Sequence, residues 1–167
     1  YIPDMLKKYN HQTSKKAQRA PHQWTTPAYG QKRQYAKTNP DLPTLSEKLT
    51  NIIQQKTGSI LYYSRAIETP ALPALTDIAR TQAKPTQHTS DEVNMLMDYM
   101  ATYPASVIRY HASDMVMHVD SDAAYLVAPG AKSRIAGYYY LSDLPNKSTF
   151  PKLNPPFHVV CKFLKHV

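Results

Sequence analysis

The sequence predicts an α+β protein in which a helical module over residues 1–105 is followed by an antiparallel sheet over residues 106–167. A change of pattern near Pro104 indicates this division. Before it, apolar residues recur mainly at helical spacing, and after it they gather in short runs rich in β-branched and aromatic residues. The connections between those runs have no room for crossover helices of about a dozen residues, so antiparallel pairing is expected.

Four segments of the first module have the pattern of helices with one apolar face. They are residues 1–9, residues 45–67, a segment starting at Thr69-Pro70 and a segment starting at Thr89. Thr44-Leu45-Ser46-Glu47 and Thr89-Ser90-Asp91-Glu92 have the form of capping boxes, and proline suits a first helical position. The apolar faces of the last three are expected to include Leu49, Ile52, Ile53, Ile60, Tyr63, Leu72, Leu75, Ile78, Ala79, Val93, Leu96, Met97 and Met100.

Short β-rich runs make up the second module. They cover residues 107–110, 115–121, 135–141 and 157–164. Each is too short for a buried helix and is bounded by proline, serine or charged residues, so each is expected to be a strand.

The chain is basic, with 20 Lys and Arg against 12 Asp and Glu, a net charge of +8 and a pI near 9.5. Part of the excess lies in residues 11–43, where prolines and polar residues replace helical periodicity and predict a long surface loop. A basic balance favours a polyanionic partner, because each neutralised phosphate releases condensed counterions. A solvated loop with its aromatic residues anchored on the helices explains the same composition, and both interpretations stay open.

Cysteine content and hydropathy indicate an intracellular protein of the cytoplasm or nucleus. Cys161 is the one cysteine and cannot form an internal disulfide, and no Cys/His cluster has zinc-ligand spacing. No apolar run approaches the roughly 20 residues needed to cross a bilayer, so no membrane partner is expected.

A carboxylate in the first long strand of the second module is the candidate metal ligand. Alternation along residues 115–121 places His118 and Asp120 on the same face as Asp122, with Met117 and Val119 opposite. Carboxylates near a strand end hold hard cations such as Mg²⁺, and paired Mg²⁺ ions clamp the oxygens of a phosphodiester. The residues alone favour the alternative that Asp122 merely ends a strand in solvent.

Several motifs occur in an order that resembles the polymerase region of Ty1/copia-type retrotransposons. Tyr1-Ile2-Pro3-Asp4-Met5-Leu6-Lys7-Lys8-Tyr9 is similar to that family's Y-I-x-x-L-L-x-R-F helix, and Gly58-Ser59-Ile60-Leu61-Tyr62 to its G-S-L-L-Y helix. Asp98-Tyr99-Met100 stands at the place of an R-Y-L helix. Ser121-Asp122-Ala123 and Lys132-Ser133-Arg134-Ile135-Ala136-Gly137-Tyr138 resemble an S-D-A-D-W strand end and the following R-x-S-x-S-G-Y strand.

The resemblance implies a fragment of a reverse transcriptase/ribonuclease H polyprotein. Residues 1–105 would form a thumb- and connection-like module that binds primer-template duplex or RNA:DNA hybrid, and residues 106–167 an incomplete antiparallel RNase H-like sheet. Asp122 would be the catalytic carboxylate that coordinates Mg²⁺ in the complete domain, and the rest of the polyprotein would be a partner. The cations expected to contact nucleic acid are Lys15, Lys16, Arg19, Lys32, Arg33, Lys132 and Arg134.

The chain departs from the family at three places. Ala124 and Tyr125 replace the second aspartate and the tryptophan of S-D-A-D-W, and Glu68-Thr69-Pro70-Ala71-Leu72 replaces T-R-P-D-I. The family's Y-x-D-D carboxylates would precede Tyr1, and the next RNase H glutamate would follow Val167. We therefore expect this polypeptide alone to be inactive. The alternative is a non-catalytic nucleic-acid-binding or assembly module.

Overall fold

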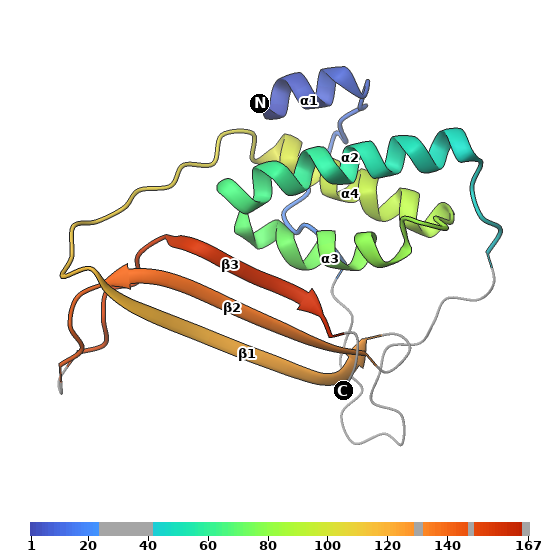
Figure 1. Ribbon diagram of the computed structural model, residues 1–167. Coiled ribbons are helices and arrows are strands. Elements are labelled where there is room, and N and C mark those ends of the chain that lie inside the picture. Colours follow the sequence, from blue (N-terminus) through green and yellow to red (C-terminus); the bar gives the residue numbers. More distant parts are fainter. Residues whose placement is uncertain (24–41, 129–131, 147–148, 165–167) are drawn as a thin grey trace. The chain divides into compact units, whose positions relative to one another are not determined.

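The computed structural model describes residues 1–23, 42–128, 132–146 and 149–164 (Figure 1). These residues belong to two compact units, and the division falls between residues 106 and 107. The first unit is helical and the second is a three-stranded antiparallel sheet, so the protein is of the α+β class. Within the described ranges, no helix has both the length and the apolar character needed to span a membrane.

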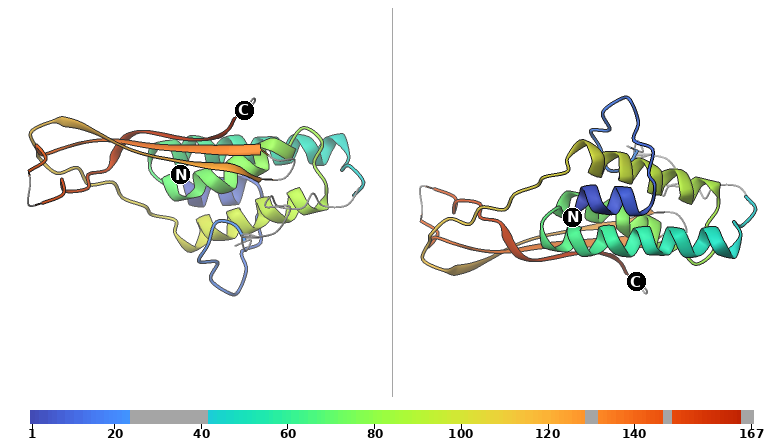
Figure 2. Two further views of the ribbon diagram at one scale, coloured as in Figure 1. Left: turned by 90° about the horizontal axis from the view of Figure 1, so that it is seen from below. Right: turned by 90° about the horizontal axis from the view of Figure 1, so that it is seen from above.

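The helical unit contains all of the predicted helices, with shifted starts. It consists of α1 (Ile2–Lys8), α2 (Glu47–Ala66), the short 3₁₀ helix η1 (Thr69–Ala71), α3 (Leu72–Thr81) and α4 (Gln87–Thr102). In the view from above, α1 lies between α2 and α4 (Figure 2).

The predicted capping boxes are both wrong. The box at the start of α4 is instead formed by Thr86 and Thr89, so Thr89 lies in the first turn and is buried. At α2 the N-cap is Ser46, whose side chain makes no capping hydrogen bond. Local sequence patterns locate helix ends less well than helix interiors, and the two N-caps lie two and three residues from the predicted ones.

The core of the helical unit is built around α4, which contacts α1, α2 and α3. As predicted, the buried residues of α4 include Val93, Leu96, Met97 and Met100. Burial of side chains of this size is the main source of stability for a unit of this kind. Two residues of the predicted apolar faces are exposed, contrary to prediction: Leu49 on α2 and Ala79 on α3. On α3, Ala74 is buried in place of Ala79. Further buried side chains come from the other helices: Ile2, Ile53, Ile60, Leu72, Leu75 and Ile78.

The sheet unit contains β1 (Val116–Ala128), β2 (Lys132–Ser142) and β3 (Pro156–Phe163), in the spatial order β1-β2-β3 (Figure 1). Both pairings are antiparallel, as predicted. In the part of the sheet that is described, β1 is therefore an edge strand. Its pairing is regular as far as Ala124, opposite Arg134, and then irregular up to Ala128; Leu126, between them, has a positive φ of 52°.

Residues 107–110 were predicted as a strand and are not one. Side-chain hydrogen bonds, and not the backbone ladder of a sheet, hold the chain at Tyr110 and His111. The backbone N–H of His111 donates to Oδ1 of Asn154, and the hydroxyl of Tyr110 donates to the carbonyl of Pro156. The amide of the buried Asn154 also donates to the carbonyls of His111 and Leu141, so one side chain joins this segment to β2.

Candidate functional site

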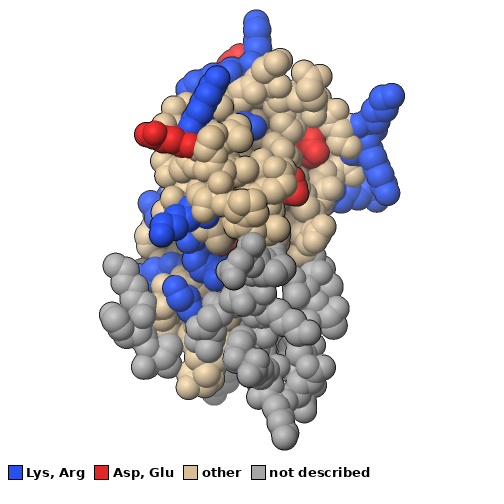
Figure 3. All heavy atoms as spheres, turned by 90° about the vertical axis from the view of Figure 1, so that its right-hand side faces the viewer, with Lys and Arg blue, Asp and Glu red and all other residues tan. Residues whose placement is uncertain are grey.

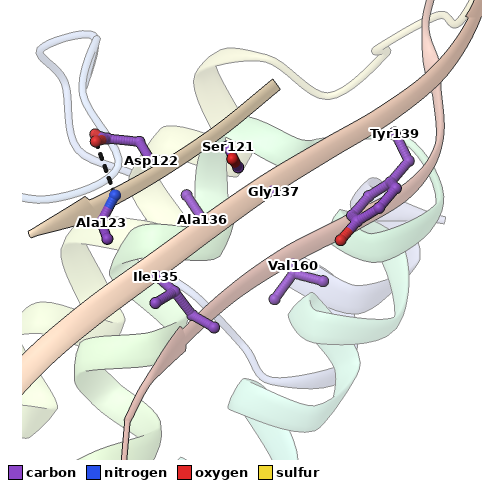
Figure 4. A pocket seen from close by; sticks show the side chains of 8 residues that line it. All are labelled: Ser121, Asp122, Ala123, Ile135, Ala136, Gly137, Tyr139 and Val160. Carbon is purple, nitrogen blue, oxygen red and sulfur yellow. Dashed lines mark hydrogen bonds between the residues drawn. The ribbon is translucent and has the colours of Figure 1, made fainter. Parts of the chain in front are cut away.

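Asp122 lies on the edge strand β1, opposite Ala136 of β2. Its side chain is exposed, and Oδ1 accepts a hydrogen bond of 2.8 Å from the backbone N–H of Ala123 (Figure 4). The strand continues beyond Asp122, which therefore lies within β1 and not at a strand end. Regular pairing of β1 with β2 stops two residues later, at Ala124. The carboxylate is thus exposed to solvent on one face of an edge strand.

The face of the sheet that carries Asp122 is polar and aromatic. The register places His118 opposite Tyr140 and Asp120 opposite Tyr138, all on the face of Asp122. The rings of His118 and Tyr140 stack with centroids 5.3 Å apart. Burial raises the pKa of both tyrosines, and the charge of Asp120 adds to that effect. The predicted alternation of side chains along β1 is therefore confirmed.

A hollow of about 470 Å³ lies on the opposite face. Its lining side chains on that face include Ser121, Ile135, Tyr139 and Val160 (Figure 4). Gly137 contributes no side chain there, and a Cβ atom at that position would lie 3.0 Å from Cε2 of Tyr139. The ring of Tyr139 can cover this part of the strand because position 137 is glycine.

The hollow and the carboxylate of Asp122 therefore belong to different sides of the sheet. Asp122 is among the residues that line the hollow, and its carboxylate extends away from the Tyr139 ring (Figure 4). This hollow therefore does not enclose the carboxylate of Asp122.

The described residues do not by themselves form a metal centre. Nowhere in residues 1–23, 42–128, 132–146 and 149–164 do three or more His, Cys, Asp or Glu side chains come together in a way that could hold a metal ion. Asp120 is two residues from Asp122 on the same strand face, which separates the two Cα atoms by roughly 7 Å. A pair of Mg²⁺ ions requires more oxygen ligands than these two side chains provide.

The cations predicted to bind nucleic acid lie in both units. Lys15, Lys16 and Arg19 are exposed in the helical unit, and Lys132 is exposed at the start of β2. Arg134 lies on the same face as Asp122, with its guanidinium 4.6 Å from the ring centroid of Phe163. The remaining two, Lys32 and Arg33, fall outside the described residues.

Lys15, Lys16 and Arg19 belong to a segment without helix or strand, residues 11–19, here named the basic strap. The ring nitrogen Nε2 of His11 and the backbone N–H of Ser14 both bind Oδ1 of Asp98, at 2.9 and 3.0 Å. This attachment was not predicted, because neither histidine nor aspartate carries a local signal for a bond between residues 87 positions apart.

Comparison with known proteins adds no relative, since no family model, no curated protein and no solved structure matches this chain. The fold and the candidate site define an α+β protein with a basic strap on a helical unit and an edge-strand carboxylate on an antiparallel sheet.

Proposed function

We propose that this chain is part of the reverse transcriptase/ribonuclease H region of a Ty1/copia-type retrotransposon polyprotein and that it binds primer-template duplex or RNA:DNA hybrid. The order of motifs in the sequence supports the family. The antiparallel order β1-β2-β3, with Asp122 on the first strand, is compatible with the start of an RNase H-like sheet. In this proposal the helical unit is the thumb- and connection-like module.

The observation that carries the binding function is the exposure of Lys15, Lys16 and Arg19 on a strap that is fixed to α4. Cations on a held segment neutralise phosphates and release their counterions without the further loss of chain entropy that an unattached loop would suffer. Such cations position a duplex through its backbone and do not select a base sequence. The proposal therefore concerns the backbone of the duplex and not a sequence motif.

Other cations of the chain provide a matched control. On the face displayed in Figure 3, Lys and Arg side chains project at several places, with uncharged residues and some Asp and Glu side chains between them. Lys48, Arg65 and Lys84 are exposed residues of the helical unit outside the strap. Their replacement changes the net charge by as much as replacement of the three strap cations.

We expect Lys15→Gln/Lys16→Gln/Arg19→Gln to weaken binding of an RNA:DNA hybrid on the order of a thousandfold at about 0.1 M salt, since three phosphates lose their cations and each neutralised phosphate contributes about one decade of affinity there. The control Lys48→Gln/Arg65→Gln/Lys84→Gln should weaken it by much less. Fluorescence anisotropy with a labelled hybrid measures both. Equal weakening in the two triple variants would show that net charge alone attracts the hybrid, and would contradict a strap-centred site.

In the same proposal, Asp122 coordinates Mg²⁺ together with carboxylates that the described residues do not supply. We expect no Mg²⁺-dependent hydrolysis of an RNA:DNA hybrid by this chain, because a single exposed carboxylate with Asp120 nearby does not make a two-metal site. A labelled-RNA cleavage assay with and without Mg²⁺ checks this. Hydrolysis that is abolished by Asp122→Asn would overturn the expectation and would show that the chain's own residues suffice.

A non-catalytic nucleic-acid-binding or assembly module is the second candidate, favoured by the missing ligand cluster among the described residues. The flanking reading frame distinguishes the two. Codons for Y-x-D-D upstream of Tyr1 and for an acidic helix downstream of Val167 support the polymerase and ribonuclease H family. Their absence from an otherwise open frame would favour the binding module.

A further inference from the structure

Two side chains on α4 hold the basic strap through acceptor atoms. Oδ1 of Asp98 accepts hydrogen bonds from Nε2 of His11 and from the backbone N–H of Ser14, at 2.9 and 3.0 Å. Oγ1 of Thr102 accepts from the backbone N–H of Gln18 at 3.0 Å and donates to the carbonyl of Asp98 at 2.9 Å. Asp98 and Thr102, here named the acceptor pair, thus fix the strap at residues 11, 14 and 18.

The acceptor pair is spaced to hold the part of the strap that carries the cations. Residues four apart lie one above the other on a helix, so Asp98 and Thr102 present their oxygens on one face of α4. The fixed backbone positions, Ser14 and Gln18, lie on either side of Lys15 and Lys16, and Arg19 follows directly. Within the strap, the backbone N–H of Lys16 donates to Oγ of Ser14 at 3.2 Å, which adds a local turn.

Burial shows that His11 is an anchor and not a further surface cation. Its side chain is 6% exposed and that of Asp98 is 23% exposed, whereas Lys15, Lys16 and Arg19 are exposed. The strap therefore has one side turned to α4 and another turned to solvent. Its cations are directed outward because the backbone beneath them is bonded.

We propose that Asp98 is a positioning residue for the binding of nucleic acid by the basic strap, acting through its bonds to His11 and Ser14 with Thr102 as second support. The inference rests on the proposed function. A carboxylate beside cations opposes the approach of a polyanion by Coulomb's law, so electrostatics alone gives Asp98 an unfavourable effect on binding. Positioning gives it a favourable one, because an attached strap loses less freedom when the duplex binds. The two effects have opposite signs, and a mutation separates them.

The test compares Asp98→Ala, Asp98→Asn and Asp91→Ala in the full chain, with anisotropy of a labelled RNA:DNA hybrid as readout. Asp91 is an exposed residue of the same helix whose Oδ1 accepts from Nε2 of Gln87, so its replacement changes the charge identically without touching the strap. Asp98→Ala should weaken binding about five- to tenfold, the effect of freeing one or two ordered side chains. Asp91→Ala should leave it unchanged or slightly tighter. Asp98→Asn keeps an oxygen acceptor and should restore most of the affinity.

Limited trypsin digestion provides the second measurement, independent of nucleic acid. Cleavage after Lys15, Lys16 and Arg19 should be faster in Asp98→Ala than in the wild type or in Asp91→Ala, while the far-UV circular dichroism of the helices stays the same. Unchanged digestion, or binding by Asp98→Ala as tight as that of Asp91→Ala, overturns the positioning role and leaves the proposed function standing. A wild-type chain that does not bind the hybrid at low salt overturns both.

Discussion

Replacing Glu68 with alanine should lower the free energy of unfolding of the helical unit by about 2 to 6 kcal/mol, because it leaves two hydroxyls without their acceptor at about 1 to 3 kcal/mol each. Glu68 follows α2 and is 7% exposed. The hydroxyl of Tyr99 on α4 donates to Oε1 at 2.6 Å, and that of Ser106 donates to Oε2. One carboxylate therefore joins the end of α2, the end of α4 and the chain that leaves the unit.

Urea denaturation followed by circular dichroism at 222 nm measures the effect. Tyr99→Phe removes a single donor and should lower stability by less than Glu68→Ala. In the double variant, the destabilisation should be smaller than the sum of the two single effects, because the residues are bonded to each other. Full additivity would mean that the hydrogen bond contributes nothing, contrary to the structure.

The same cluster makes stability depend on alkaline pH. Burial raises the pKa of Tyr99 well above its ordinary value of 10, and the hydrogen bond to Glu68 adds to the shift. The unfolded chain then loses this proton first as the pH rises past about 10, so the free energy of unfolding falls above that pH. In Tyr99→Phe, the free energy of unfolding should fall less steeply between about pH 10 and 11 than in the wild type. Urea denaturation at each pH measures this difference.

Replacing Leu96 with alanine should lower the free energy of unfolding by about 2 to 5 kcal/mol, the usual range for a leucine truncated in a closed core. Leu96 is 0% exposed and lies on α4, the helix that contacts α1, α2 and α3. The truncated side chain leaves a cavity among several helices, which cannot all move to fill it. A change of this size is a large fraction of the stability of a small domain.

Leu49→Ala is the matched control, since the same atoms are removed from a leucine of α2 that is 46% exposed. It should change stability by about 0.5 kcal/mol or less. Urea midpoints of the two variants give the comparison. Equal effects would mean that Leu96 is not in a closed core, and would contradict the central position of α4.

Periodicity was sufficient to predict the helices and three of the four expected strands. The apolar stripe of α4 is strictly local information, and Val93, Leu96, Met97 and Met100 are buried as the spacing predicts. Alternation likewise placed His118, Asp120 and Asp122 on one face of β1, which the register confirms.

Features that depend on distant side chains could not be predicted from local pattern. The bonds from His11 to Asp98 and from Tyr99 to Glu68 join residues far apart in the sequence, so no spacing indicates them. Residues 107–110 have β propensity, but side-chain hydrogen bonds of Tyr110 and Asn154 hold the chain here and no strand ladder forms. Asp122 was expected at a strand end, and the continuation of β1 to Ala128 depends on its pairing with β2.

A salt titration of hybrid binding tests the proposed function most directly. For the wild type, the logarithm of the association constant should fall linearly with the logarithm of salt concentration. In the Lys15→Gln/Lys16→Gln/Arg19→Gln variant, the slope should become shallower by about 0.9 for each phosphate that the variant no longer neutralises. A wild-type slope that the triple variant leaves unchanged, or no binding at about 50 mM salt, would contradict a nucleic-acid-binding strap on α4.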